Sequence, residues 1–480
     1  MSRRKAKSKT KSREIIRTDV WDLSASPEEK RLIVLTIEEY RRYLKALVLI
    51  VNSQWPKLAE LTTKERVNAI EKAIHQTAKN PEPKHRYFRS VVQKYPSFRK
   101  FPSYLRRAAI ADAIGIVSSF QTRYRAWQSG ERKHRCCQPP KLTAMCRSYP
   151  SLYKGQQIRY GENYRTIQIK IWNGKDWVWS AEISVKKQGK NRHLVEGNEI
   201  KSPALVVNKR TCQLSMPVKV KKVEREESEY VCSVDLGINN AATAAIVGAD
   251  GTVKARKFIN PARDIDRRNR RRMKIARKAK QTARIIGKKH GKRCDPAEVS
   301  SAKERAPRKG FCKGLYRKSS HINREISRKV MREIVEFAKA HNAKVIVFEN
   351  LAGWKAKAGR KGTLHKQKFH LWCHRKIVEL TQERWRELGG KVVFINPKYT
   401  SAYAFDGSGK VKRGKSNYSL CRFSTGKQYH ADLNASYNIG ARYWYCVLMG
   451  DKNFSRVYVG KSSDCTLRTP VVLGTLRGLS

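Results

Sequence analysis

Apolar residues recur at helical spacing through much of the first quarter of the chain. They fall three and four positions apart from Glu28 to about Leu61, and again through Glu65–Thr77 and Phe88–Trp127. That period is typical of amphipathic helices with one face on a core. Residues 20–130 are therefore predicted to be mostly helical, with Lys and Arg side chains on the exposed faces.

The pattern shortens to an alternation of two residues near Pro139. From there to Val223 the chain carries short, aromatic-rich segments such as Arg165–Trp172 and Trp177–Ile183, separated by turns that contain glycine. This favours β-structure, either a small barrel or a curled sheet. A basic, aromatic barrel could stack nucleobases, although most of these rings are expected in the core.

A third module begins at Tyr230, after the acidic residues 224–229. Tyr230–Leu236 has the pattern of a buried strand that delivers Asp235 at its end, and two more strands are expected over Ala241–Val247 and Thr252–Ile259. Three consecutive antiparallel strands with an acid on the first are typical of the start of an RNase H-like fold.

A second acid ends another predicted strand. Helical periodicity over residues 322–337 leads into the nearly continuous apolar stretch Lys344–Leu351, whose C-terminal end carries Glu349. An ionised Glu after four buried strand residues is costly unless it is paired or coordinates a metal. The pattern therefore singles out Glu349 as a candidate ligand.

The last predicted elements are a helix of roughly Phe369–Leu388, a strand at Lys391–Pro397 and a short helix within Ala431–Gly440. Asp432 lies in the first turn of that short helix. One face of the helix is expected on the core, with the carboxylate pointing into the site. Taken alone, any one of these acids could be a helix cap or a salt-bridge partner, and for Asp432 this alternative is as well supported as a catalytic role.

Together, Asp235, Glu349 and Asp432 supply hard oxygen ligands from three separate elements, as magnesium or manganese requires. Two such ions, roughly 3.5–4 Å apart, activate an attacking water and stabilise the leaving oxygen of a phosphodiester. The trio, in this order and on these elements, predicts a catalytic metal site.

The charge balance points to a polyanionic partner. Lys and Arg total 104 against 40 Asp and Glu, which gives a net charge of +64, and the basic residues run through the whole chain. A compact protein with that surplus repels itself unless a polyanion neutralises it. No apolar stretch approaches 18 residues and the basic N-terminus leads into no apolar signal core, so nucleic acid, a long RNA above all, is favoured over a membrane. Composition alone leaves a ribosomal-type or chromatin-type coating protein open.

Eleven cysteines, without framework spacing, are expected to be reduced cytoplasmic thiols.

A strongly basic helix is predicted between the first two acids, over Arg263–Arg293. A lone helix this charged is poorly stable in water, so phosphate contact is favoured over a merely solvated face. The residues expected to bind nucleic acid are Arg267, Arg268, Arg271, Arg272, Lys274, Arg277 and Lys278.

Several motifs resemble those of the TnpB transposon nucleases and of the compact type V CRISPR effectors. They are Val234–Gly237, Ile346–Leu351, Asn396–Ser401 and Ala431–Ser436, and they follow in the order seen in those proteins. The likeness covers Tyr230–Tyr445. The N-terminal half agrees only in architecture, as a helical recognition lobe with a wedge-like β-barrel.

The resemblance implies an RNA-guided DNA endonuclease with one RuvC nuclease site. Asp235, Glu349 and Asp432 fall on the three catalytic acids of that family, with Mg²⁺ or Mn²⁺ as the cofactor. A guide RNA would occupy the basic channel, and its base pairing would read the target DNA. It further implies a cytoplasmic prokaryotic protein that acts on the nucleoid and is associated with transposons, and it is compatible with a divergent type V-U branch.

One departure from the family concerns its zinc ribbon, which has two Cys-x-x-Cys knuckles. Ala404 and Gly407 stand where the first pair of cysteines would be, and Cys421 is retained opposite Ser424. One thiolate cannot hold a structural zinc that needs four ligands. We therefore expect no bound zinc, with the loop packed instead by Tyr418, Phe423 and Tyr429.

The predicted fold class is a bilobed, mixed α/β, multidomain protein. Its expected regions are a basic tail (1–13), the start of the wedge domain with the helical recognition lobe (14–138), the β-barrel wedge domain (139–229), the first RuvC segment (230–398), a degenerate zinc-ribbon-like insertion (399–430), and the second RuvC segment with a C-terminal tail (431–480). Two rival functions stay open: an RNA-guided DNA-binding protein without cleavage, used for silencing or transposition recruitment, and a DDE-type transposase that works without RNA.

Overall fold

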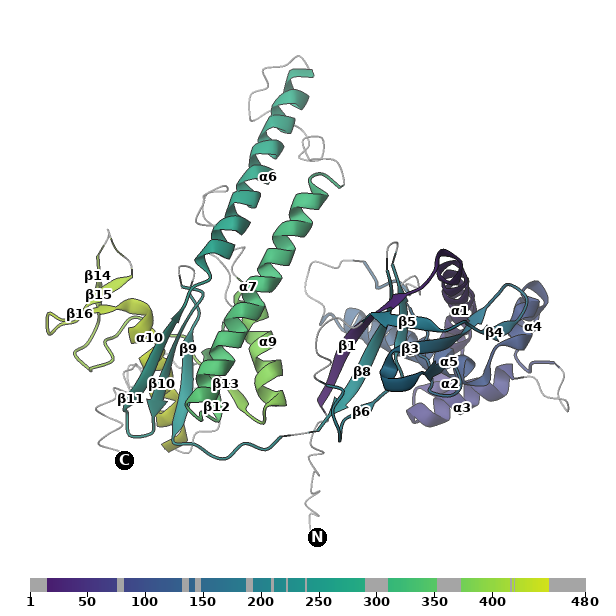
Figure 1. Cartoon of the computed structure of the whole chain (residues 1–480), viewed down its shortest axis with the longest axis horizontal. Helices are drawn as coiled ribbons and strands as arrows, with labels where there is room; N and C mark the ends of the chain where they lie inside the picture. Colours follow the sequence, from purple (N-terminus) through teal and green to yellow (C-terminus); the bar gives the residue numbers. More distant parts are fainter. Residues whose placement is uncertain are drawn as a thin grey trace, which may run out of the picture. The chain divides into compact units, whose positions relative to one another are not determined.

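The computed structural model divides the chain into two compact units, Met1–Lys221 and Lys222–Ser480 (Figure 1). The described residues are 15–75, 82–131, 138–142, 148–186, 193–208, 211–221, 223–237, 240–289, 310–351, 373–414, 417 and 419–448. Several predicted features lie outside them: the basic tail at residues 1–13, the end of the basic helix predicted over Arg263–Arg293, Tyr418, and residues 449–480, which include the predicted C-terminal tail.

A mostly antiparallel sheet forms one half of the first unit. Its strands pair in the order β2-β3-β5-β1-β8-β6, with β4 also beside β3 and β7 also beside β8. The bounds are β1 Ile15–Ser24, β2 Ile158–Tyr160, β3 Thr166–Trp172, β4 Trp177–Trp179, β5 Ile183–Lys186, β6 Glu199–Ile200, β7 Ala204–Val207 and β8 Cys212–Val220. The pairings run along an open path, so the predicted β-region is a half-barrel sheet. Its inward-facing side chains, such as Trp21, Ile169 and Leu214, form one core.

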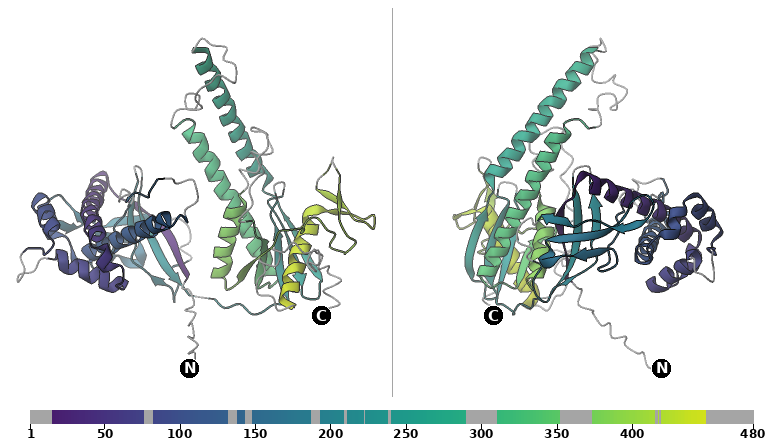
Figure 2. Two further views of the ribbon diagram at one scale, coloured as in Figure 1. Left: turned by 180° about the vertical axis from the view of Figure 1, so that it is seen from behind. Right: turned by 45° about the vertical axis from the view of Figure 1, so that its right-hand side comes forward.

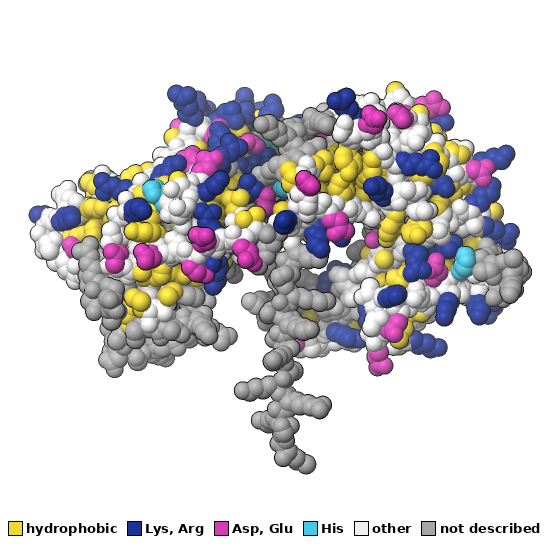
Figure 3. Space-filling model, turned by 60° about the horizontal axis from the view of Figure 1, so that its bottom comes forward, with side chains coloured by type: hydrophobic (Ala, Val, Ile, Leu, Met, Phe, Trp, Pro, Cys, Tyr) yellow, Lys and Arg dark blue, Asp and Glu magenta, His cyan; other side chains and the backbone are white. Residues whose placement is uncertain are grey.

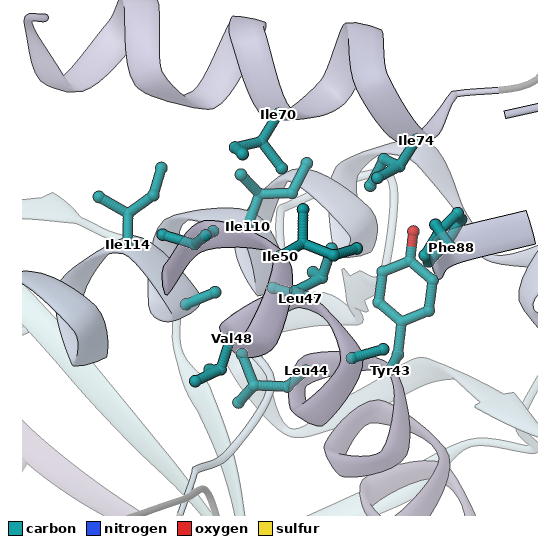
Figure 4. Packing of buried hydrophobic residues seen from close by; sticks show 14 of the residues in the cluster. Tyr43, Leu44, Leu47, Val48, Ile50, Ile70, Ile74, Phe88, Ile110 and Ile114 are labelled. Atoms are coloured by element: carbon teal, nitrogen blue, oxygen red, sulfur yellow. The ribbon is translucent and has the colours of Figure 1, made fainter. Parts of the chain in front are cut away.

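Helices make up the other half of this unit. They are α1 Pro27–Ser53, α2 Trp55–Leu58, α3 Thr63–Ile74, α4 Arg86–Lys94 and α5 Ser103–Gln128, with a 3₁₀ turn at Pro96–Lys100. Capping boxes fix two of the starts, Ser26 with Glu29 and Thr62 with Glu65, because each pair satisfies backbone N–H groups that a helix leaves open. Apolar faces of α1, α3, α4 and α5 meet in a common core (Figure 4).

The helical prediction for residues 20–130 is wrong at its first five positions, which belong to β1. Side chains of this strand alternate between exposed and buried, with Trp21 and Leu23 turned inward. β1 pairs with β8 over nine residue pairs and joins the sheet formed more than a hundred residues later. The helical period begins only after the Ser26 cap. The alternating segment before it is too short, beside the long helical pattern, to be recognised as a strand from the sequence.

The second unit is built around a five-stranded sheet with the order β11-β10-β9-β12-β13. Its strands are β9 Tyr230–Asp235, β10 Ala242–Gly248, β11 Val253–Ile259, β12 Val345–Glu349 and β13 Lys391–Ile395. β10 is antiparallel to both β9 and β11, whereas β12 runs parallel to both β9 and β13. All five strands agree with the predicted strands to within two residues.

Helices cover both faces of this sheet. α7 (Lys313–Ala340) and α9 (His374–Glu387) pack on one face, and α10 (Ala431–Leu448) packs on the other (Figures 1 and 2). α6 (Ala262–Lys289) lies alongside α7 and extends beyond the sheet. The predicted helix at Ala431–Gly440 is longer than expected and continues to Leu448. The start of the helix predicted from Phe369 lies outside the described residues.

α10 approaches the sheet most closely at Gly440. A Cβ atom added there would lie 2.6 Å from Val247 Cγ2 and 3.1 Å from Ser233 Oγ, which is closer than packed carbon atoms allow. The missing side chain therefore sets the distance between the helix and strands β9 and β10.

A small three-stranded sheet precedes α10. It consists of β14 Lys412–Arg413, β15 Leu420–Arg422 and β16 Gln428–His430, joined in that order. None of the described helices is long and apolar enough to cross a membrane. Lys and Arg side chains are spread over the face of the molecule seen in Figure 3, with acidic side chains between them.

Candidate active site

Side-chain alternation along two neighbouring strands turns two of the predicted acids to the same face of the sheet. Val234 and Phe348 belong to the core beneath α7 and α9. Because successive side chains in a strand point to opposite faces, Asp235 and Glu349 face the side that α10 covers. Both acids are the last residues of their strands.

The strand register makes these two acids neighbours. β9 and β12 are parallel, and Val234 pairs with Phe348, so Asp235 and Glu349 occupy the next position on each strand. Adjacent strands lie about 4.8 Å apart. Two carboxylates are thus placed side by side at the C-terminal ends of the two central strands.

The third acid reaches the same edge of the sheet from α10. Asp432 lies in the first turn of that helix, and the amide of Asn240, in the turn after β9, donates a hydrogen bond to Asp432 Oδ2 over 3.1 Å. Gly237 allows this approach, because a Cβ atom there would meet Asn240 O at 2.7 Å and Asp432 Oδ2 at 3.7 Å. The turn that follows Asp235 therefore contacts Asp432.

The three acids interact electrostatically. Desolvation raises the pKa of Asp235 well above its usual value, and the neighbouring charges of Glu349 and Asp432 raise it further. The charge of Arg413 and the backbone N–H of Leu236 oppose that rise without cancelling it. Such mutual repulsion is the mark of carboxylates that share a site.

Glu349 has its own set of partners. Desolvation raises its pKa, while a hydrogen bond from the Thr400 hydroxyl and the positive charge of Arg442 act in the opposite direction. Thr400 is 1% exposed and Arg442 is 2% exposed, so both contacts are screened from water. The Thr400 hydrogen bond orients Glu349, and both partners oppose the rise of its pKa without cancelling it.

A divalent cation fits the chemistry of this site. Three carboxylates without a cation repel one another, and a bound Mg²⁺ would replace that repulsion with attraction. Thr243 supports the fit: it pairs with Asp235 across β9 and β10, and its buried hydroxyl has no hydrogen-bond partner among the described residues. A metal-bound water is the kind of group that would satisfy such a hydroxyl.

The side chains of Asp235, Glu349 and Asp432 do not, however, converge on one point in this structure. Across the part of the chain that the structure describes, no three His, Cys, Asp or Glu side chains are close enough together to hold a metal ion. The structure thus places the three predicted acids at one end of the sheet, within electrostatic reach of one another. Their roles as metal ligands and as catalytic residues stay predictions.

The predicted nucleic-acid-binding residues of α6 fall into two groups. Arg267, Lys274, Arg277 and Lys278 are exposed. Arg268 is only 6% exposed, and its guanidinium donates to Asn323 of α7 over 3.2 Å. Arg271 is half-buried; Arg272 bonds Ser319 and lies over the Tyr316 ring. In this structure Arg268 and Arg272 therefore join α6 to α7, and the more exposed residues remain the candidates for phosphate contact.

The segment predicted as a degenerate zinc ribbon is packed by apolar side chains. Ala404 is fully buried together with Cys421 and Phe423. Phe405 contacts the rings of Phe423 and Tyr429, at centroid distances of 5.6 and 5.0 Å. The predicted packing by Phe423 and Tyr429 is confirmed, and Tyr418 lies outside the described residues. The absence of zinc stays a prediction.

Sequence reasoning missed the polar side chains that interact with the acids or with the segment that carries Thr400. They are Asn240, Thr243, Thr400, Asn434, Asn438 and Arg442. One signal was present: in the otherwise apolar helix α10, three of them recur every four residues and so share one face.

Both units of the chain match known protein families. Residues 17–173 match the Aq_aa04 family, and residues 374–439 match the Cas12f1-like TNB domain. A TnpB-like protein from Aquifex aeolicus (strain VF5), aq_aa05, is 29% identical over 240 residues, which cover 47% of this chain and 70% of that protein. The relationship to TnpB-like proteins that the motifs predicted is thereby confirmed.

Two solved structures are similar over most of the chain. A Cas12f1–sgRNA–target DNA complex has 12% identity and a TM-score of 0.49, covering 89% of this chain and 99% of that one. The mini-RNA-guided endonuclease CRISPR-Cas_phi3 has 13% identity and a TM-score of 0.48, covering 89% of this chain and 92% of that one.

Proposed function

We propose that this relative of TnpB-like proteins is an RNA-guided DNA endonuclease that hydrolyses target DNA by a two-metal-ion reaction at a RuvC site. The observation that carries the proposal is the register of β9 and β12. It sets Asp235 beside Glu349 on the face of the sheet where α10 presents Asp432. A merely structural role does not explain why three like charges, which repel one another, lie together at the C-terminal ends of these strands.

Each acid has a separate position in the proposed site. Asp235 lies beside Glu349 in the strand register, and the charges of both other carboxylates raise its pKa. Glu349 is oriented by the Thr400 hydroxyl, and Asp432 is oriented by the Asn240 amide. Bound Mg²⁺ ions would supply an activated water and stabilise the leaving oxygen. Arg413, whose charge acts on Asp235, is suited to attract the phosphodiester toward the acids.

The proposed partners are a guide RNA and a target DNA. A net charge of +64 suits a chain that neutralises a long, folded polyanion. Exposed basic residues of α6, including Arg267, Lys274 and Arg277, are suited to phosphate contacts, whereas base pairing with the guide would read the target sequence. We also propose a cytoplasmic location for this complex, acting on the nucleoid.

A cleavage assay tests the proposal. The full chain, purified with the RNA bound to it in cells, is incubated with a duplex matched to that RNA and with Mg²⁺. We expect cleavage of matched DNA, no cleavage of unmatched DNA, and loss of cleavage in EDTA. Intact matched DNA at saturating protein would refute the nuclease, and full activity of an RNA-free preparation would refute the guide.

A second candidate function is RNA-guided DNA binding without cleavage. The observation that favours it is that the acidic side chains do not converge on one point among the described residues. This function predicts tight, guide-dependent binding of matched DNA, measured by gel shift, with no product after long incubation in Mg²⁺ or Mn²⁺.

A further inference from the structure

The side chains of α10 that follow Asp432 form a buried polar stripe. Asn434, Asn438 and Arg442 are four residues apart and are 0%, 2% and 2% exposed. Residues at this spacing lie on one face of a helix. Burying three large polar side chains is costly unless each is hydrogen-bonded, so the partners of this stripe define its role.

All three side chains bind the backbone of the segment 396–405. Asn434 donates to Tyr403 O over 2.7 Å and accepts from Phe405 N over 2.8 Å. Asn438 donates to Thr400 O over 2.8 Å and to Tyr403 O over 2.9 Å. Arg442 donates to Asn396 O over 2.6 Å and to Lys398 O over 3.0 Å. The stripe thus holds the segment at five backbone positions.

The segment needs this support because its backbone is strained. Tyr399 has a φ of +70°, in the left-handed region that a bulky residue rarely adopts. Such a conformation persists only where the surroundings over-determine it, and strain of this kind clusters at functional sites. Here the surroundings are the contacts of Arg442 to Lys398 and of Asn438 to Thr400, one residue on either side of Tyr399.

The segment delivers one side chain to the acids. Thr400 is 1% exposed, and its hydroxyl hydrogen-bonds Glu349 Oε1. One helix therefore carries Asp432 in its first turn and, through the next three turns, fixes the residue that orients Glu349. The two acids are held in register by the same rigid element.

We propose that Thr400 is a positioning residue for Glu349, and that the stripe of Asn434, Asn438 and Arg442 positions Thr400. This inference rests on the proposed metal-dependent nuclease. Hydrogen-bond partners of metal-binding side chains typically contribute about 10- to 100-fold to metal affinity. The stripe would therefore act on metal affinity without touching metal or DNA.

The test compares Thr400→Val with Thr400→Ser in the full chain bound to its RNA. Site-bound Mn²⁺ is measured by electron paramagnetic resonance, counting only the binding that Asp235→Ala abolishes, so that Mn²⁺ on the RNA is excluded. We expect Thr400→Val, which keeps the shape and loses the hydroxyl, to weaken that binding about 10- to 100-fold. Thr400→Ser keeps the hydroxyl and is expected to restore it.

Thr381→Val is the matched control. Thr381 is equally buried in the same unit, and its hydroxyl bonds Ile377 O within α9. It should leave Mn²⁺ binding unchanged. Equal Mn²⁺ affinity in Thr400→Val and the unaltered chain would overturn the positioning role while the nuclease stands. Absence of any site-bound Mn²⁺ in the unaltered chain would overturn both.

A second variant tests the stripe itself. Asn434→Ala removes both hydrogen bonds to segment 403–405, so the Phe405 amide should exchange its hydrogen faster and Mn²⁺ binding should weaken. Asn417→Ala, whose side chain accepts from the Ser419 amide, serves as its control. Faster exchange at Phe405 with unchanged Mn²⁺ affinity would reduce the stripe to a structural support and overturn its positioning role.

Discussion

Two neighbouring parts of the second unit, each predicted from the sequence to be an intact or a degenerate metal site, differ in the side chains that they bury. At the strand ends, polar groups are retained although their burial is unfavourable: Asp235 and Glu349 stand side by side with desolvated carboxylates. In the ribbon segment 399–430, which is predicted to be a degenerate zinc ribbon, Ala404, Gly407 and Ser424 stand at three positions where the resemblance implies cysteines. Apolar side chains pack in the interior of this segment.

If the proposed function holds, the difference indicates which kind of metal site apolar packing can replace. A structural zinc stabilises a small fold, and apolar contacts between Phe405, Phe423 and Tyr429 can supply stability in its place. A catalytic metal supplies an activated water and charge stabilisation, and no arrangement of apolar side chains does so. Changes on each side of this comparison should therefore have different consequences, in cleavage on one side and in stability on the other.

The largest expected effect comes from Asp235→Ala. Removing the central carboxylate should lower the DNA cleavage rate by about 1,000-fold or more, because several kcal/mol of transition-state stabilisation depend on the bound metal. Guide-dependent DNA binding, measured by gel shift, should not change. Asp406→Asn, in an exposed turn, serves as the control. Cleavage by Asp235→Ala at the rate of the unaltered chain would remove Asp235 from the site.

Phe423→Ala tests the apolar side of the comparison. Phe423 is 3% exposed, and truncation of such a ring typically costs about 3–5 kcal/mol. We expect a lower melting temperature of the unit that contains it, measured by calorimetry. Leu420→Ala changes a side chain three residues away, in β15, that is 40% exposed, and it should have little effect. Equal melting of the two variants would contradict the role of this cluster.

The raised pKa of Asp235 predicts a pH dependence of stability without divalent metal. Because the folded state holds this proton more tightly than the unfolded state, the free energy of unfolding should fall as the pH rises above the usual Asp pKa toward the folded one. Asp235→Asn removes this penalty. In EDTA at neutral pH it should melt a few degrees above the unaltered chain and show no such advantage at acidic pH, below the usual Asp pKa of about 3.9.

The smallest expected effect is that of zinc removal. With an apolar interior in the ribbon segment, the purified protein should contain no stoichiometric zinc by mass spectrometry, and a zinc chelator should leave its melting temperature unchanged. One zinc per chain, or a clear loss of stability with chelator, would show that other residues have taken over the ligand role.

Features that depend on local periodicity could be predicted from the sequence. The strands of the second unit are predictable because apolar runs such as Lys344–Leu351 are bounded by turns. The acids are predictable as site residues because an ionised carboxylate after such a run is unfavourable without a partner. The relationship to TnpB-like proteins followed from the order of the motifs.

Other features depend on contacts between distant segments and could not be predicted in this way. β1 pairs with β8 across almost two hundred residues, so its place in the sheet is invisible locally. Arg268 had the sequence context of a phosphate-binding residue, yet its guanidinium reaches Asn323 across the helix pair. Thr400 gained its significance only when the fold brought it to Glu349.

The close approach of α10 at Gly440 has a consequence for engineering this chain. Because the helix rests directly on Val247 and Ser233 at that point, a larger side chain at Gly440 would push α10 away from β9 and β10. Asp432 lies eight residues before Gly440 on the same helix, roughly 12 Å along its axis. A substitution at Gly440 should therefore change the distance between Asp432 and the two acids on the strands, although Gly440 itself is remote from the acids.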